Sequence, residues 1–95
     1  MRVLRWSLIG MKLKKAYELL KGNPKNIRYE DLCQAAEAFG FRLRGGKGSH
    51  RVYIREGVRE ILNFQDVDGR AKPYQVRQLL KIVENYKLTE DDDAI

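Results

Sequence analysis

The segment RLRGGKGSHRVYI, residues 42–54, is where the residue pattern changes from helical to extended. Upstream of it, apolar residues recur every three or four positions, as on one face of a helix. Within it, two short runs, 42–44 and 52–54, alternate in the way that half-buried strands do. Three glycines and Lys47 lie between these runs. The segment therefore predicts two strands joined by a flexible, cationic loop, and His50, the single histidine of the chain, stands where the second strand begins.

Two helices are predicted before this segment and one after it, each with a single apolar face. Gly22 and Gly40 suit helix ends because glycine adopts the left-handed conformation found there, and Pro73 suits a first helical position. The residues expected on the three apolar faces are Leu13, Ala16, Tyr17 and Leu20, then Leu32, Ala35, Ala36 and Phe39, then Val76, Leu79, Leu80 and Val83.

A third strand is predicted over roughly 58–65, after a tight hairpin at Glu56-Gly57, and the DVDG run at 66–69 predicts a turn. The order helix, helix, three strands, helix predicts an α+β domain in which helices cover one face of a three-stranded antiparallel sheet. Alternation divides the side chains of the first two strands between the faces of this sheet. Those expected toward the helices are Phe41, Leu43, Val52 and Ile54, and those expected on the open face are Arg42, Arg44, Arg51, Tyr53 and Arg55.

Composition favours a small basic domain with a polyanionic partner. The 95 residues carry a formal net charge of +6, although the tail TEDDDAI holds four carboxylates. Basic domains most often bind nucleic acid, and an arginine-rich face with a tyrosine suits phosphates and a stacked base. The alternative is an ordinary solvated face. No apolar run is long enough for a membrane span, the opening ten residues do not resemble a signal peptide, and the lone Cys33 fits a reducing cytoplasm.

Several chemistries do not fit the glycine-rich loop. A Walker phosphate loop requires Lys-Ser or Lys-Thr followed by a helix, whereas glycine and then a strand follow Lys47. Ser49 and His50 are adjacent on a strand, so their side chains point apart, and no acidic residue is marked to orient the imidazole. One histidine and one distant cysteine are too few for a zinc site, and DVDG lacks the closing glutamate of a calcium loop. No metal or small-molecule cofactor is therefore expected.

What remains is a solitary imidazole among cations. Histidine exchanges a proton near neutral pH, so it can deprotonate the 2′-hydroxyl of a bound RNA for attack on the adjacent phosphorus. Neighbouring lysine and arginine would stabilise the charge that develops in the transition state. A hydrogen-bonded structural histidine at the start of a strand is the alternative that composition and spacing leave open.

The runs RYEDLCQAAEAFGFRLRGGKGSHRVYIREG and KPYQVRQLLKIVENYKL resemble the HicA toxins, also called YcfA-like mRNA interferases. The resemblance covers roughly residues 24–88, and its most specific features are the Gly-Ser-His at 48–50, the FGF joint at 39–41 and the start of the last helix. It implies a double-stranded-RNA-binding-like fold, here with an extra N-terminal helix. It divides the chain into an extension with a helix (1–23), the HicA-like domain (24–88) and an acidic disordered tail (89–95).

The resemblance also implies a function: the toxin of a type II toxin–antitoxin pair, a ribosome-independent endoribonuclease that cleaves mRNA and is neutralised by a HicB-type antitoxin. By motif, His50 matches the catalytic histidine. Where many family members have a second histidine this chain has Arg51, so a two-histidine mechanism is excluded and the proton for the leaving oxygen must come from water, Lys47, Lys72 or His50 itself. A non-catalytic RNA-binding module is the alternative function. The expected RNA-binding residues are Arg44, Lys47, Gly48, Ser49, Arg51, Arg55, Lys72 and Arg77.

Overall fold

The computed structural model describes residues 12–89, which form three helices and a four-stranded antiparallel sheet. Of the expected N-terminal extension and helix (1–23), residues 1–11 lie outside the described residues, and so does the expected acidic tail (89–95) apart from Thr89. The elements in chain order are α2 (Leu13–Gly22), α3 (Tyr29–Ala38), β1 (Arg42–Gly45), β2 (His50–Ile54), β3 (Leu62–Val67), β4 (Arg70–Ala71) and α4 (Pro73–Asn85). The α+β class and the extra N-terminal helix, α2, are as predicted.

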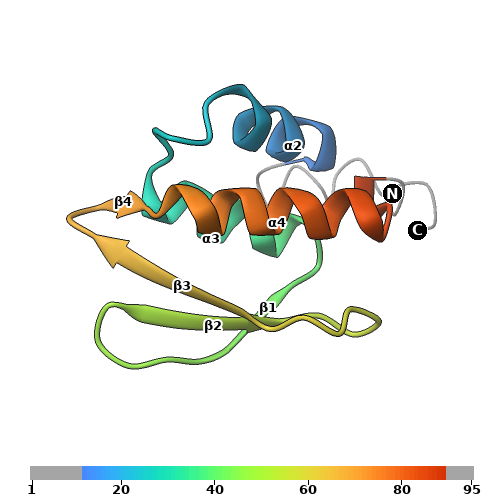
Figure 1. The fold of residues 1–95 in the computed structure, drawn as a ribbon. Helices are drawn as coiled ribbons and strands as arrows, with labels where there is room; N and C mark the ends of the chain where they lie inside the picture. The colour runs from blue at the N-terminus through green and yellow to red at the C-terminus, as the bar shows by residue number, and fades with distance from the viewer. Residues whose placement is uncertain (1–11, 90–95) are drawn as a thin grey trace.

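The elements stack in layers, with all three helices on one side of the sheet (Figure 1). The strands follow one another in sequence order, β1-β2-β3-β4. Helix α3 contacts β3 and β4, α4 contacts β3, and α2 packs on α3 and α4 as an outer layer. The opposite face of the sheet is covered by no described element, so it is available to a partner.

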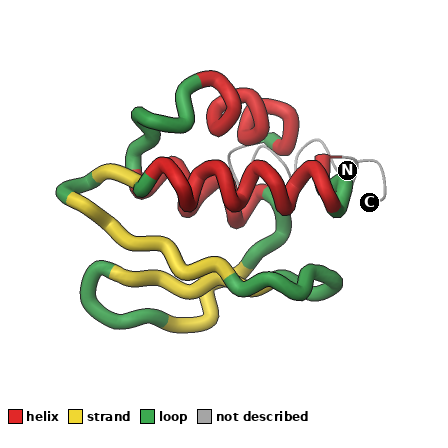
Figure 2. Tube along the Cα trace, in the orientation of Figure 1, coloured by secondary structure: helices red, strands yellow, loops and turns green. Residues whose placement is uncertain are grey.

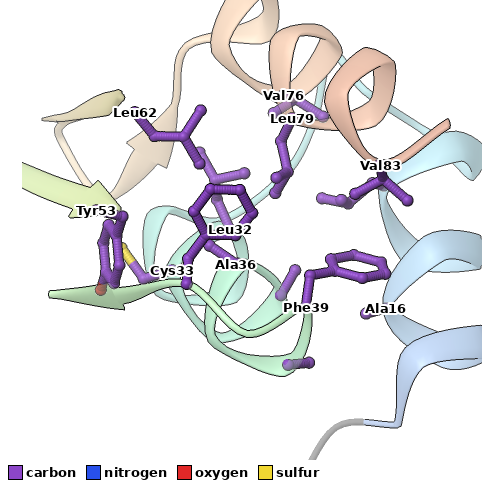
Figure 3. Packing of buried hydrophobic residues seen from close by; sticks show 14 of the residues in the cluster. Ala16, Leu32, Cys33, Ala36, Phe39, Tyr53, Leu62, Val76, Leu79 and Val83 are labelled. Carbon is purple, nitrogen blue, oxygen red and sulfur yellow. The ribbon is translucent and has the colours of Figure 1, made fainter. Parts of the chain in front are cut away.

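The predicted apolar faces of the helices form the core. Leu13, Ala16 and Leu20 of α2 are buried, as are the four positions predicted for the second helix and three of the four predicted for α4. Figure 3 shows Phe39 between the helices, beside Ala16 and Val83. Gly40 ends the turn after α3 with φ of 93°, as expected of a glycine at a helix end.

The predicted faces of β2 were wrong. Tyr53 is completely buried and packs against Phe64, with ring centroids 5.7 Å apart, and Figure 3 shows it beside Cys33 under α3. Val52 and Ile54, expected toward the helices, lie on the other face and are half-buried. Tyr53 faces the helices because its ring fills the space under α3 and its hydroxyl donates a hydrogen bond to Glu37 at 3.1 Å.

Leu43 was also expected to be buried, but it is 54% exposed. It pairs with Tyr53 and so lies on the helical side of the sheet. However, β1 is at one edge of the sheet, and the helices contact the sheet through β3 and β4, toward the other edge. The layer above the sheet therefore ends before it reaches Leu43.

The third strand begins later than predicted. Glu56 and Gly57 do form a turn, with Gly57 at φ of 88°, but the chain returns to the sheet only at Leu62, opposite Tyr53. The stretch between them is a loop (Figure 2). Tyr86 at the end of α4 holds this loop, because its hydroxyl donates to Glu60 at 2.8 Å and accepts from the Arg59 amide at 3.4 Å.

A fourth strand, β4, was not predicted. The turn in DVDG falls on Asp68 and Gly69, which both have positive φ (54° and 85°), as in the tight hairpin turns that suit sheet twist. The chain therefore reverses at once into β4. The edge of β4 that faces away from β3 is hydrogen-bonded to the segment before α3, since the Ala71 amide donates to the Ile27 carbonyl at 2.9 Å. The predicted three-stranded sheet is thus a four-stranded one.

Beyond the short β4, a buried side chain covers the edge of β3. Gln75, in the first turn of α4, accepts a hydrogen bond from the Gln65 amide at 3.0 Å and donates one to the Asn63 carbonyl at 2.9 Å. It is 5% exposed. These contacts satisfy backbone groups that would otherwise form an open sheet edge, and they fix the start of α4 beside β3.

Candidate nucleic-acid interface

The glycine-rich loop closes as a two-residue hairpin turn. Lys47 and His50 exchange backbone hydrogen bonds, each 3.1 Å from donor nitrogen to acceptor oxygen. Gly48, the first residue of the turn, has φ of 63°, as in the type II′ turn that commonly joins antiparallel strands. The turn is also held from the side, because the Asp66 amide donates to the Ser49 carbonyl at 2.8 Å. The loop that was predicted to be flexible therefore holds His50 at a defined place.

Gly46 is required by a close approach of two backbones. A β-carbon built on Gly46 would lie 2.2 Å from the carbonyl oxygen of His50 and 2.9 Å from the Cα of Arg51. Its φ of 148° is also one that other residues rarely adopt. The register of β1 shifts just before it, between Leu43 and Gly45, as in a β-bulge. The bulge and Gly46 together bring the loop backbone over the start of β2.

His50 is exposed and lies on the open face of the sheet. Arg51 and Tyr53 face the helices, so alternation places His50 on the opposite side together with Val52. The histidine turns outward without a bulge in β2. Within residues 12–89 the imidazole has no hydrogen-bond partner, which leaves both ring nitrogens available to a ligand. This favours the functional interpretation of His50 over the structural one.

A shallow hollow of about 290 Å³ adjoins the glycine-rich loop and the start of β2. It is lined by the loop from Gly45 to Gly48 together with Leu43, His50 and Arg51. Glycines keep it open to a bulky group, and Lys47 supplies positive charge beside it. Arg44, Lys47, Gly48 and Ser49, all predicted to contact RNA, are exposed around this hollow. The structure therefore brings these four residues together with His50.

Arg51 also lines the hollow, but its side chain lies on the helical side of β2. Its guanidinium meets the Glu30 carboxylate at 3.3 Å and stands over the ring of Tyr29, 5.3 Å from the centroid. Interaction with Tyr53, and then with Glu30, raises its pKa further above the ordinary arginine value. These contacts join β2 to the first turn of α3. They suit a residue that fixes the strand carrying His50, and they compete with a phosphate for the guanidinium.

Arg55 is likewise engaged with the protein. Its Nε donates to the Phe39 carbonyl at 2.7 Å and its Nη1 to the Glu56 carbonyl at 3.3 Å. The side chain passes so close to Gly40 that a β-carbon there would lie 2.6 Å from Nε. Arg55 thus serves the joint between α3 and β1, at the end of β2 opposite His50.

Lys72 and Arg77 belong to the start of α4, which lies one strand away from His50. His50 pairs with Gln65, and the Gln65 amide is bonded to Gln75 in the first turn of α4. Lys72 is the residue before that helix, and Arg77 is exposed on its surface. The helix N-terminus adds backbone N–H groups that favour an anion.

Tyr74, in the same first turn, was missed by the sequence reasoning. It is 58% exposed, and the ammonium of Lys72 lies 5.8 Å from its ring centroid. An exposed aromatic ring beside a cation is a stacking platform for a nucleobase. The signal in the sequence was the tyrosine directly after Pro73, where a helix begins and its first residues stay near the surface. Tyr53, which was predicted to stack on a base, is buried, whereas Tyr74 is exposed.

Two further features bear on the chemistry. Across residues 12–89, no three histidine, cysteine or acidic side chains cluster in a way that holds a metal ion. In the same part of the chain, no helix is long and apolar enough to cross a lipid bilayer. The chemical groups that the site itself presents are therefore an imidazole, ammonium and guanidinium cations, and exposed backbone amides.

The comparison with known families agrees with this geometry. Residues 29–84 match the family described as HicA toxin of bacterial toxin-antitoxin. No curated protein and no solved structure shows significant similarity to the chain. The family match spans more than half of the chain and includes His50, the hairpin loop and all of α4 except its last residue, so the chain belongs to the HicA toxin family. It is the toxin of a toxin–antitoxin system, and such a system includes a cognate antitoxin.

Proposed function

We propose that this member of the HicA toxin family is an endoribonuclease that cleaves mRNA or other single-stranded RNA in the cytoplasm, with His50 as the general base. The observation that carries the proposal is the placement of His50: the chain's one imidazole is exposed at the start of β2, next to a hollow lined by glycines and Lys47. A phosphodiester bound against the glycine-rich loop would lie beside Lys47 and the start of β2, where His50 is exposed.

The reaction needs one proton removed and one supplied. Neutral His50 takes the proton of the 2′-hydroxyl, and the 2′-oxygen attacks the adjacent phosphorus to form a cyclic phosphate. The bond from phosphorus to the 5′-oxygen breaks, and that oxygen receives a proton from protonated His50, from Lys47 or Lys72, or from water. Lys47 and Arg44 stabilise the charge on the non-bridging phosphate oxygens. No metal ion enters these steps.

The remaining groups of the site serve binding. Gly48 and Ser49 let the backbone approach a phosphate closely, and Lys72 and Arg77 extend the cationic surface toward α4. Tyr74 supplies a ring on which a base can stack. Arg51 and Arg55 attach β2 to α3 and to the segment after it, and in this proposal they do not contact RNA. In the cell, we expect a HicB-type antitoxin to silence the activity.

Single-turnover cleavage of a defined RNA in buffer with EDTA tests the proposal. Wild type should yield fragments with cyclic or 3′-phosphate ends, and a substrate with 2′-deoxyribose at the cleaved position should stay intact. His50→Ala and His50→Gln should lower the rate by about 10²–10⁴-fold, the usual contribution of a positioned base. Because His50 is exposed, both variants should melt at the wild-type temperature.

The alternative, a non-catalytic RNA-binding module, predicts a different result. RNA would then bind in a salt-dependent manner without being cut, and His50→Ala would change affinity alone. A well-folded His50→Ala variant that cleaves at the parent rate would contradict the assignment of the base.

A further inference from the structure

Gln65 of β3 lies directly opposite His50 in the sheet. The next residue along β3, Asp66, donates its amide to the Ser49 carbonyl across the ladder. The Gln65 amide points the other way and donates to Gln75. His50 and Gln65 therefore form a non-hydrogen-bonded pair, the kind in which opposite side chains come closest together. Because His50 lies on the open face of the sheet, the side chain of Gln65 lies there beside it.

Among the described residues, the carboxamide of Gln65 has no hydrogen-bond partner, and neither has the imidazole of His50. The backbone beneath the carboxamide is fixed, because Gln75 binds the Gln65 amide at 3.0 Å and the Asn63 carbonyl at 2.9 Å. The side chain of Gln65 can still turn about its own torsions, which brings its amide oxygen to the ring on the neighbouring strand. A carboxamide oxygen and an imidazole N–H are a matched acceptor and donor.

The charged residues next to this pair cannot accept a proton from the ring. Asp66 follows Gln65 and so faces the helical side of β3, where its Oδ1 accepts a hydrogen bond from the Gly69 amide at 2.6 Å. Lys47, in the turn before His50, carries only donors. A carboxamide also suits the place better than a carboxylate would, because it accepts a hydrogen bond without adding a negative charge that repels RNA phosphates.

We propose that Gln65 is a positioning residue for the base: its carboxamide oxygen accepts a hydrogen bond from the Nδ1–H of His50. In a neutral imidazole, the hydrogen bond made by one nitrogen decides which nitrogen carries the proton. Nε2, at the tip of the ring, is then left unprotonated and free to take the proton of the 2′-hydroxyl. The inference rests on the proposed function in taking His50 as the base. Gln65 itself touches no reacting atom and acts only through the imidazole.

Nitrogen-15 NMR of the full chain tests this directly, because its single histidine gives one pair of ring-nitrogen signals. The quantity measured is the ratio of the Nδ1–H to the Nε2–H tautomer in the neutral imidazole. Gln65→Leu removes the acceptor and should lower this ratio by roughly two- to tenfold, the shift that one net hydrogen bond produces. Asn63→Leu is the matched control, since it removes a carboxamide from the same face of β3 but opposite Val52, and it should leave the ratio unchanged.

Cleavage rates on the same preparations supply a second readout. At saturating RNA, Gln65→Leu should cut roughly 10–100-fold more slowly than wild type, the loss that follows removal of a group that orients a functional histidine. Its RNA affinity should stay near wild type, because Gln65 does not contact RNA. Gln65→Glu keeps the acceptor, so it should retain the Nδ1–H tautomer and bind RNA more weakly through its added negative charge.

The inference is overturned if Gln65→Leu keeps the wild-type tautomer ratio, or if Asn63→Leu changes the ratio as much as Gln65→Leu does. It is overturned equally if Gln65→Leu shifts the ratio but cuts saturating RNA at the parent rate, since the hydrogen bond would then not serve the base. Failure of the proposed function is distinct: wild type would leave RNA uncut while the tautomer ratios of the variants stand as expected.

Discussion

Replacing Arg51 by alanine should weaken the fold and leave the electrostatics of RNA binding unchanged. The guanidinium is committed to Glu30 at 3.3 Å and to the ring of Tyr29. The ion pair is substantially exposed, with side-chain exposures of 39% and 58%, so solvent reduces its contribution to about 0.2–1 kcal/mol. The cation–π contact adds roughly 0.5–1 kcal/mol. The sum is about 0.7–2 kcal/mol of unfolding free energy. Each 1 kcal/mol corresponds to a fall in melting temperature of roughly 4–8 °C for a domain of this size.

The assay pairs thermal melts with salt titrations of RNA affinity. Removing one cation that binds a phosphate of single-stranded RNA reduces the slope of log affinity against log salt by about 0.7. Arg44→Ala should show that reduction and melt like wild type, because Arg44 is exposed beside the hollow. Arg51→Ala should keep the wild-type salt slope and melt at a lower temperature. Glu30→Gln is the matched control: it removes the ion pair, keeps the stacking on Tyr29, and should cost less stability than Arg51→Ala.

One result would refute this reasoning. If Arg51→Ala reduced the salt slope by about 0.7 and melted at the wild-type temperature, the guanidinium would be a phosphate ligand that leaves Glu30 when RNA binds. Arg51 would then return to the RNA-binding group that its sequence neighbours suggested.

Two further predictions concern the loop and the core. Gly46→Ala should lower stability by about 1–3 kcal/mol and reduce RNA cleavage, because its new methyl group would displace the backbone of His50. Gly45→Ala, where nothing lies within 4 Å, should do neither, and equal behaviour of the two variants would contradict the close approach. Burial raises the pKa of Tyr29 to about 12 and also raises the pKa of the Cys33 thiol. The unfolded chain therefore loses these protons first, and the unfolding free energy from urea titrations should fall above about pH 9. Tyr29→Phe removes a hydroxyl that is buried without a partner, so this variant should be as stable as wild type at neutral pH. Its unfolding free energy should fall less steeply with rising pH than that of wild type. An equally steep fall would contradict the raised pKa of Tyr29.

The helices and the loop were readable from the sequence because their signals are local. The apolar period of the segments around Leu20, Leu32 and Leu79 predicted three helices with the correct buried faces. The glycines around Lys47 predicted a turn, and His50 was correctly placed at the start of β2. Each of these features depends on residues within a few positions of one another, so no knowledge of distant partners was needed.

The faces of β2 and the number of strands depended on the tertiary structure. Arg51-Val52-Tyr53-Ile54-Arg55 alternates equally well in either orientation, since one face offers two aliphatic residues and the other a tyrosine between arginines. Phe64 and Cys33 provide the space that buries Tyr53, and Glu30 provides the partner that accepts Arg51. Those residues lie far away in the chain. Strand β4 also depends on the tertiary structure. Its two residues are too few to show a sequence pattern, and they form a strand only by pairing with β3 and with the backbone before α3.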